Sequence, residues 1–155
     1  MRALTDAVHA GTRDEAIAGV RVSIVEALQA TADDVLSCHG IILGTPANFG
    51  YMSGALKHFF DSTFLRIGGA LSDDGSAGSG PAGDERTGAG GRLPYGLYVH
   101  GRYDATGAIR SVTSIADALP WRRSAEVLAV LGDVTDEDLA RAYDLGGTLA
   151  ALLTD

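Results

Sequence analysis

Short apolar runs alternate along this chain with segments whose apolar residues recur at helical spacing, and this alternation limits the fold more than any other feature. β-branched or all-apolar runs predict strands over 20–27, 40–44, 95–100 and 124–130. Helical periodicity and capping residues predict helices over 1–10, 31–37, 53–63, 108–119 and 135–153. Alternation of this kind, with strands buried on both faces, is typical of a parallel sheet between two helical layers. We therefore expect a three-layer α/β/α domain.

One segment departs from this pattern. Nine of the 21 glycines fall within residues 68–92, GGALSDDGSAGSGPAGDERTGAGGR, where Leu71 is the clear large apolar side chain. Such a segment cannot bury a core of its own, and its Gly/Ser/Ala composition predicts a flexible coil. It is either a mobile lid or an inert surface insertion within a single domain that spans residues 1–155.

Composition and charge disfavour several classes of function. Hydrophobic residues make up 46% of the chain and charged residues 21%, which is enough apolar material for a core. Twelve basic against 20 acidic residues give a net charge of −8, which disfavours binding to nucleic acid or to anionic membranes. Cys38 is the single cysteine, and the four histidines lack metal-ligand spacing, so we expect no intrachain disulfide and no metal site. The sequence has neither an apolar run of membrane-spanning length nor a secretory signature, so we expect a cytoplasmic protein.

The ligand-binding edge of a parallel α/β sheet lies where its strands end, which directs attention to two loops, 45–53 and 101–107. The second loop follows directly on His100, the histidine that we favour at a site because it ends a strand at this edge.

The first of these loops has the composition of a binding loop for a flat ring. It belongs to the run GTPANFGYMSGALKHFFD, residues 44–61. Pro46 fixes one φ angle, and Gly50 lets the backbone approach a ligand closely. The helix that begins near Ser53 turns its free N–H groups toward the same space. The same residues also suit an ordinary strand-to-helix turn, with Ser53 as the cap and Met52 in the core.

This run resembles the second flavin loop of the flavodoxin-like NAD(P)H-dependent FMN reductases and quinone reductases. In that family a buried strand ends in G-T/S-P, and an aromatic-containing loop leads to G-x-M-S/P-G-x-L-K-x-F-x-D on a helix. A second run, PYGLYVHGRYDATGAI over 94–109, is similar to the family's loop that closes over the flavin after the fourth strand. The resemblance implies non-covalently bound FMN, NAD(P)H as co-substrate, a small electron acceptor such as a quinone, and a homo-oligomer.

The resemblance also implies which residues contact the flavin, and it implies no catalytic acid, base or nucleophile. On one side of the ring system the implied residues are Thr45, Pro46, Ala47, Asn48, Phe49, Gly50, Tyr51 and Met52. On the other side they are His100, Gly101, Arg102, Tyr103 and Asp104. Residues 45–53 include no acidic side chain, which suits the negative charge of a reduced flavin.

One part of the family pattern is missing. The family opens with an apolar strand and a Ser/Thr-rich loop that holds the FMN phosphate at the N-terminus of the first helix, whereas this chain begins directly in that helix. The missing strand would be the central one, between the strands expected over 20–27 and 40–44. In one interpretation Met1 is an internal residue of a longer natural chain, with roughly 10–15 residues missing. In the other, the two strands pair directly and FMN affinity is lost or much reduced.

Three functions are therefore compatible with the sequence. The first is an FMN-dependent oxidoreductase, and the second is a flavin-free relative that acts as an interaction subunit. The third is an electron carrier of the flavodoxin type, for which the net charge of −8 would suit docking to basic partners. The electron acceptor and the choice between NADH and NADPH have no signature in the sequence.

Overall fold

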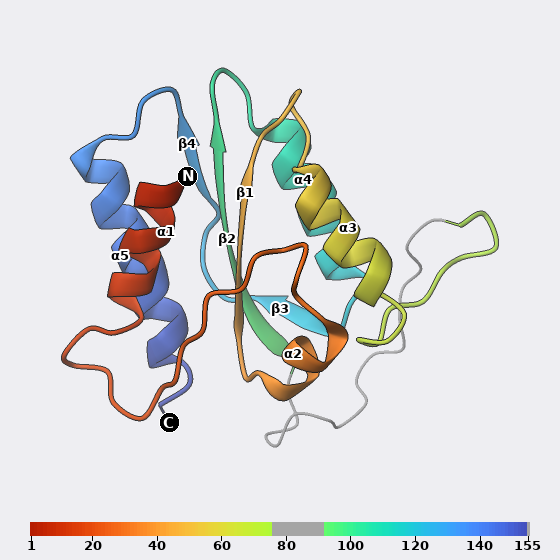
Figure 1. Ribbon diagram of the computed structural model, residues 1–155, viewed down its shortest axis with the longest axis horizontal. Helices are drawn as coiled ribbons and strands as arrows, with labels where there is room; N and C mark the ends of the chain where they lie inside the picture. Colours follow the sequence, from red (N-terminus) through yellow and green to blue (C-terminus); the bar gives the residue numbers. More distant parts are fainter. Residues whose placement is uncertain (76–91, 155) are drawn as a thin grey trace.

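Four strands form one parallel sheet in the computed structural model, which describes residues 1–75 and 92–154 (Figure 1). β1 (Ile41–Pro46) pairs with one side of β2 (Leu93–Gly101). The other side of β2 pairs with β3 (Trp121–Arg123) along its first half and with β4 (Leu128–Leu131) along its second half. The described sheet is therefore three strands wide, with β1 at one edge and β2 in the centre.

Helices cover both faces of this sheet. α1 (Arg2–Gly11) and α5 (Asp136–Ala151) form one layer, and α3 (Gly54–Thr63) and α4 (Thr106–Asp117) form the opposite one (Figure 1). The short α2 (Ala32–Ser37) lies near the bottom of the view. This arrangement confirms the predicted three-layer α/β/α architecture with a parallel sheet.

The core has two parts, one on each face of the sheet. The part beneath α1 and α5 consists of Leu4, Val8, Tyr98, Leu128, Val130, Ala142, Leu145 and Leu149. The larger part, beneath α3 and α4, contains an aromatic cluster in which the Trp121 ring lies 6.3 Å from Phe60 and 6.0 Å from Tyr95, between centroids. Full burial of a large apolar side chain stabilises a fold by about 1.5–3 kcal/mol, so these two clusters hold the layers together.

Glycines let α1 and α5 approach backbone to backbone. A Cβ atom on Gly11 would lie 1.9 Å from the carbonyl oxygen of Tyr143, and a Cβ atom on Gly146 would lie 2.0 Å from that of Val8. Neither position has room for a side chain. The Tyr98 hydroxyl lies 2.7 Å from Oγ1 of Thr5, and burial raises the pKa of Tyr98. These contacts fix α1 against both α5 and the sheet.

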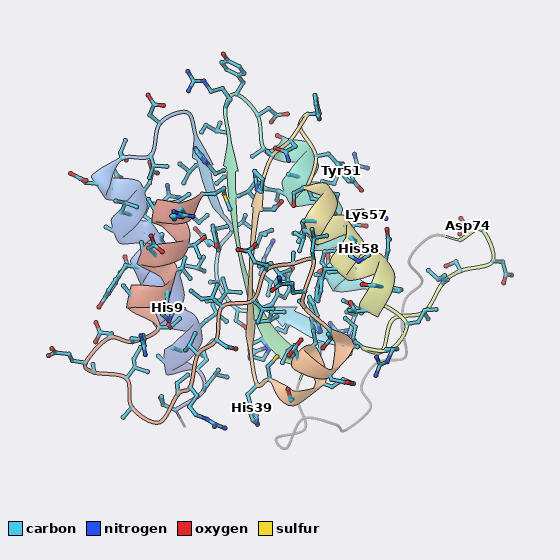
Figure 2. The ribbon with its side chains drawn as sticks, viewed as in Figure 1. His9, His39, Tyr51, Lys57, His58 and Asp74 are labelled. Carbon is cyan, nitrogen blue, oxygen red and sulfur yellow. The ribbon has the colours of Figure 1, made fainter. Side chains whose placement is uncertain are left out.

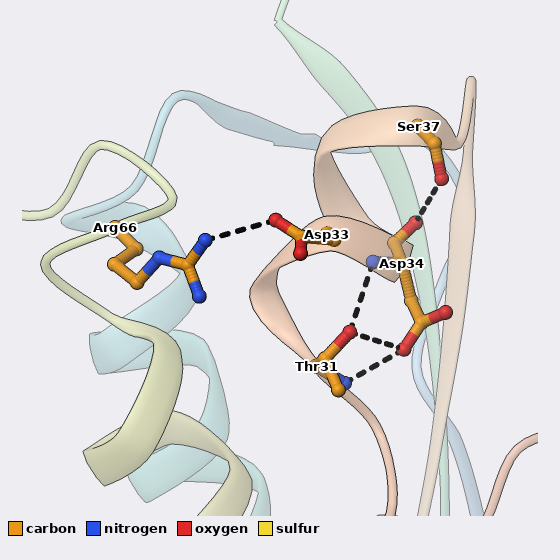
Figure 3. A network of polar contacts seen from close by, with 5 residues as sticks. All are labelled: Thr31, Asp33, Asp34, Ser37 and Arg66. Atoms are coloured by element: carbon orange, nitrogen blue, oxygen red, sulfur yellow. Dashed lines mark hydrogen bonds and ion pairs between the residues drawn. The ribbon is translucent and has the colours of Figure 1, made fainter.

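A capping box and an ion pair hold α2 in place (Figure 3). The Thr31 hydroxyl accepts a hydrogen bond from the Asp34 N–H at 3.3 Å, and the Asp34 carboxylate accepts one from the Thr31 N–H at 2.8 Å. Arg66, which follows α3, donates to Asp33 at 2.9 Å. Both side chains of this ion pair are exposed, so it orients α2 beside α3 and adds little stability.

The strand predicted over 20–27 is wrong. Residues 20–26 form neither helix nor strand, and the side chains of Val22, Ile24 and Val25 are 37%, 56% and 45% exposed. In Figure 1 this segment crosses in front of β1 and does not run along it. β propensity describes residues that fit a paired, half-buried surface, and this segment has no hydrogen-bonded neighbour strand. Direct pairing with β1, one of the two alternatives for the missing strand, does not form.

The strand predicted over 124–130 is also corrected, because two shorter strands take its place. β3 lies before the predicted range, and β4 covers only its end. Between β3 and β4 the Ser124 N–H still donates to the Tyr95 carbonyl oxygen at 2.9 Å, so only a short stretch is not hydrogen-bonded to β2. The other predicted elements agree with the structure to within two residues at each end. Most of the glycine-rich segment predicted over 68–92 lies outside the described residues.

Among the residues that the structure describes, no helix has the length and apolar character needed to cross a membrane.

Candidate functional site

Three loops meet at the carboxyl edge of the sheet, at the top of Figure 1. They connect β1 to α3, β2 to α4 and β4 to α5. A shallow pocket of about 360 Å³ lies between them. Its lining residues are Pro46, Ala47 and Asn48 from the first loop, His100, Gly101 and Arg102 from the second, and Gly132, Asp133 and Val134 from the third. Parallel strands that end together thus build the pocket, as expected for this class of sheet.

A buried hydroxyl fixes the base of the first loop. Thr45 is fully buried, and its Oγ1 accepts a hydrogen bond from the Ser53 N–H at 2.9 Å. The same hydroxyl donates to the Pro46 carbonyl oxygen at 2.9 Å. The Ala47 N–H donates to the His100 carbonyl oxygen at 2.9 Å, which ties the first loop to the end of β2. Ser53 then caps α3 by accepting from the Leu56 N–H.

The tip of the first loop is a tight turn that presents an aromatic ring to solvent. The Tyr51 N–H donates to the Asn48 carbonyl oxygen at 2.9 Å, and Phe49 and Gly50 between them have φ angles of 52° and 74°. Two consecutive positive φ angles define a type I′ turn. Glycine adopts this conformation freely, whereas a bulky residue such as Phe49 is strained there by about 1–3 kcal/mol. The Phe49 side chain is fully exposed, so burial of its ring within the protein does not offset this strain.

Another glycine holds this turn against the second loop. A Cβ atom on Gly107 would lie 2.2 Å from the Gly50 carbonyl oxygen. The tip of the first loop therefore rests on the first turn of α4, and a side chain at Gly107 would push it away.

His100 connects the second loop to the third. Its Nε2 lies 2.7 Å from the Gly132 carbonyl oxygen, and since that oxygen can only accept, Nε2 carries the proton. The Gly132 N–H in turn donates to the Gly101 carbonyl oxygen at 2.9 Å. The other ring nitrogen, Nδ1, lies 3.3 Å from the amino group of Met1, so the N-terminal end of α1 also borders this edge.

The charges around the pocket are few and mostly paired. Arg102 and Asp133 form an exposed ion pair at 3.3 Å across the second and third loops. Asp104 accepts a hydrogen bond from the Thr106 N–H at 2.9 Å, and this bond holds the pKa of Asp104 below its ordinary value. The Asp104 carboxylate thus satisfies the backbone N–H of Thr106, the first residue of α4. Within residues 1–75 and 92–154 no group of three His, Cys, Asp or Glu side chains is arranged to hold a metal ion.

The structure brings six of the thirteen predicted site residues into the pocket wall: Pro46, Ala47, Asn48, His100, Gly101 and Arg102. Three aromatic side chains on the bordering loops are exposed: Phe49 fully, Tyr103 by 85% and Tyr51 by 45%. Figure 2 places Tyr51 near the start of α3, while His9, His39 and His58 lie elsewhere on the molecule.

The other four predicted residues do not line the pocket. Thr45 and Met52 are buried beneath the first loop, Gly50 forms its turn, and Asp104 accepts a hydrogen bond from the Thr106 N–H at the start of α4. The prediction missed the third loop, with Gly132, Asp133 and Val134. The signal was present, because a third parallel strand must end at the same edge.

Comparison with solved structures identifies the fold, whereas no family model matches the chain. An archaeal flavodoxin superposes with a TM-score of 0.73 at 16% identity, over 99% of this chain and 90% of that one. A flavodoxin, WrbA-like protein from Agrobacterium tumefaciens has a TM-score of 0.62 at 16% identity, over 97% and 87% of the two chains. A flavone reductase has a TM-score of 0.64 at 18% identity, over 99% of this chain and 58% of that one. The chain therefore has the flavodoxin-like fold, as its motifs predicted.

Proposed function

We propose that the pocket binds the isoalloxazine ring system of FMN and that the protein is an FMN-dependent oxidoreductase. Its electrons would come from NAD(P)H and pass to a small acceptor such as a quinone. The observation that carries the proposal is the convergence of six motif residues, from two loops about 50 positions apart in the sequence, on one pocket. The likeness to flavodoxins, a WrbA-like protein and a flavone reductase supports it. FMN, when bound, supplies the hydride and electron transfer chemistry.

The pocket fits a flat ring system in size and in character. Its volume of about 360 Å³ lies within the range of small-molecule sites, about 300–1,000 Å³. Small residues, among them Ala47, Gly101 and Gly132, leave room for a planar ligand to approach the backbone. The first loop brings no carboxylate to the pocket, and Asp133 is paired with Arg102. The environment is therefore suited to a ligand that becomes negatively charged on reduction.

The aromatic side chains on the bordering loops supply the contact that a flavin ring requires. Phe49 is fully exposed and held in a strained turn, and a strained, exposed residue beside a pocket is a reason to look for function. Tyr103 stands 85% exposed on the second loop. We assign Phe49 and Tyr103 the role of covering the bound ring system, and the backbone of 46–48 and 100–102 the role of orienting it.

The substitution Phe49→Ala tests this assignment. It removes an exposed ring and keeps the Cβ atom, so the strain of the turn is unchanged and the fold should keep its stability. Loss of one aromatic stacking contact should weaken FMN binding about tenfold, which corresponds to about 1.4 kcal/mol. The matched control is Leu36→Ala, which shortens another exposed apolar side chain, 55% exposed on α2 away from the pocket. Titration of FMN fluorescence measures both, and equal FMN affinities of the two variants would contradict the assignment of Phe49.

An electron carrier of the flavodoxin type is the second candidate. The net charge of −8 and the 90% coverage of a flavodoxin of similar length favour it. Steady-state oxidation of NAD(P)H in the presence of a quinone separates the two candidates, because only the reductase turns over without a protein partner. If FMN does not bind at all, the flavin-free interaction subunit takes their place. Light scattering tests the homo-oligomer that the resemblance implies.

A further inference from the structure

His100 is hydrogen-bonded to two of the three loops that line the pocket and leads directly into the other one. It lies near the end of β2, where the second loop begins. Its carbonyl oxygen accepts a hydrogen bond from the Ala47 N–H of the first loop at 2.9 Å. Its ring Nε2 lies 2.7 Å from the Gly132 carbonyl oxygen of the third loop. The main chain and the side chain of one residue thus relate the positions of all three loops.

The third loop depends on the His100 side chain once it leaves the sheet. The Gly132 N–H donates to the Gly101 carbonyl oxygen at 2.9 Å, which extends the pairing of β4 with β2 by one bond. Gly132 has a φ angle of 77°, so the chain turns there out of the strand conformation. The ion pair of Asp133 with Arg102 is exposed on both sides and stabilises little. The bond from the half-buried His100 is therefore the stronger of the two side-chain contacts on this loop.

This contact determines whether the pocket has its third wall before a ligand arrives. Gly132, Asp133 and Val134 of the third loop line the pocket. A loop that becomes ordered only on binding lowers the affinity for the ligand, whereas a loop that is already held in place does not. Nε2 is engaged as the donor to the Gly132 carbonyl oxygen, so it is not available to a ligand. The His100 side chain therefore acts on a ligand through the position of the third loop.

We propose that His100 is a positioning residue, whose side chain holds the third loop as a wall of the flavin site and makes no hydrogen bond to the flavin from Nε2. The proposal rests on the proposed function and gives His100 a role other than the flavin contact that the family resemblance implies. Without the Nε2–H donor, the Gly132 carbonyl oxygen loses its side-chain partner and the third loop is free to move. The loss of one such hydrogen bond should weaken FMN binding about tenfold.

The variants His100→Gln and His100→Met separate the hydrogen bond from the bulk of the side chain. Glutamine and methionine are unbranched and similar in length, but only glutamine has an N–H donor at its end. His100→Gln should keep the FMN affinity within about threefold of that of the unmodified chain, and His100→Met should bind FMN about tenfold more weakly than His100→Gln. Titration of FMN fluorescence measures both affinities. A side chain that served only to fill space would give the two variants equal affinities, which would overturn the proposal.

Amide hydrogen exchange without flavin tests the third loop directly. The Gly132 amide should exchange about tenfold faster in His100→Met than in His100→Gln, because the loop that carries it opens more often. Asp133→Asn breaks the exposed ion pair between the second and third loops and should change this rate by no more than about twofold. Equal exchange of the Gly132 amide in His100→Met and His100→Gln would refute the proposal at any FMN affinity.

The two measurements separate a failure of this proposal from a failure of the proposed function. If the unmodified chain binds no FMN, the proposed function fails, and exchange of the Gly132 amide still decides whether His100 holds the third loop. If His100→Met releases the loop without changing the FMN affinity, the third loop is no part of the flavin site and the proposal is wrong. If His100→Met does not fold, ¹⁵N NMR of the unmodified chain at pH 8 decides instead. The imidazole proton of His100 should lie on Nε2, and a proton on Nδ1 alone would contradict the proposal.

Discussion

The substitution Thr45→Val isolates the hydroxyl that holds the base of the first loop. Valine has the shape of threonine, so the fully buried site keeps its packing. The Ser53 N–H then loses its acceptor at 2.9 Å, and the Pro46 carbonyl oxygen loses a donor. An unsatisfied buried donor costs about 1–3 kcal/mol. Because Ser53 is only half-buried, we expect the lower part of this range, about 1–2 kcal/mol.

Thr63→Val in α3 is the matched control. Thr63 is also buried, at 2% exposure, and its hydroxyl donates to the Phe59 carbonyl oxygen at 2.7 Å. That oxygen lies within the helix and accepts a backbone hydrogen bond as well, so no group is left without a partner. We expect a loss of no more than about 0.5 kcal/mol for this variant.

Urea denaturation followed by circular dichroism measures both changes. With a slope of about 2 kcal/mol per molar urea, Thr45→Val should lower the midpoint by about 0.5–1 M and Thr63→Val by about 0.25 M or less. Thr45→Val should also raise the exchange rate of the Ser53 amide and weaken FMN binding, because the first loop is no longer fixed at both ends. Equal midpoints for the two variants would refute the role assigned to the Thr45 hydroxyl.

Two further predictions concern stability. Gly146→Ala should destabilise the protein by about 2 kcal/mol or more in the same urea assay, because its Cβ would lie 2.0 Å from the Val8 carbonyl oxygen. Gly147→Ala, whose nearest contact would be 3.5 Å, should be neutral or stabilising, and the reverse order would contradict the close packing of α1 on α5. The hydrogen bonds from Thr135 hold the pKa of Asp138 below its ordinary value of 3.8. The stability that this carboxylate contributes is therefore present above pH 3.8 and is lost as the pH falls through the lowered pKa. Asp138→Asn should therefore show a smaller fall of the urea midpoint between about pH 5 and pH 2.5, and an unchanged fall would contradict the assignment.

The candidate site combines local motifs with contacts that form only in the folded chain. Glycine and proline in the first loop, and the helix that begins near Ser53, are local features, so the sequence indicated a binding loop there. The link from His100 to the Gly132 carbonyl oxygen joins residues 32 positions apart, and no local pattern encodes it. The burial of Met52, at 2% exposure, likewise depends on what α3 and α4 place around it. This explains why Met52, expected against the flavin by resemblance, lies in the core.

The alternation of apolar runs and helical stripes determined the architecture by itself, because strands buried on both faces and amphipathic helices can hide their apolar surface only in layers. Capping residues such as Thr31 and Thr135 determined helix starts to within a residue, since they act within one turn. Residues 20–26 and 124–127 were decided by the tertiary structure. A strand exists only when a neighbour accepts its hydrogen bonds, and for 20–26 the described sheet offers none. The pocket also exists only in the folded chain. Its three loops are far apart in sequence and meet because parallel strands end at one edge of the sheet.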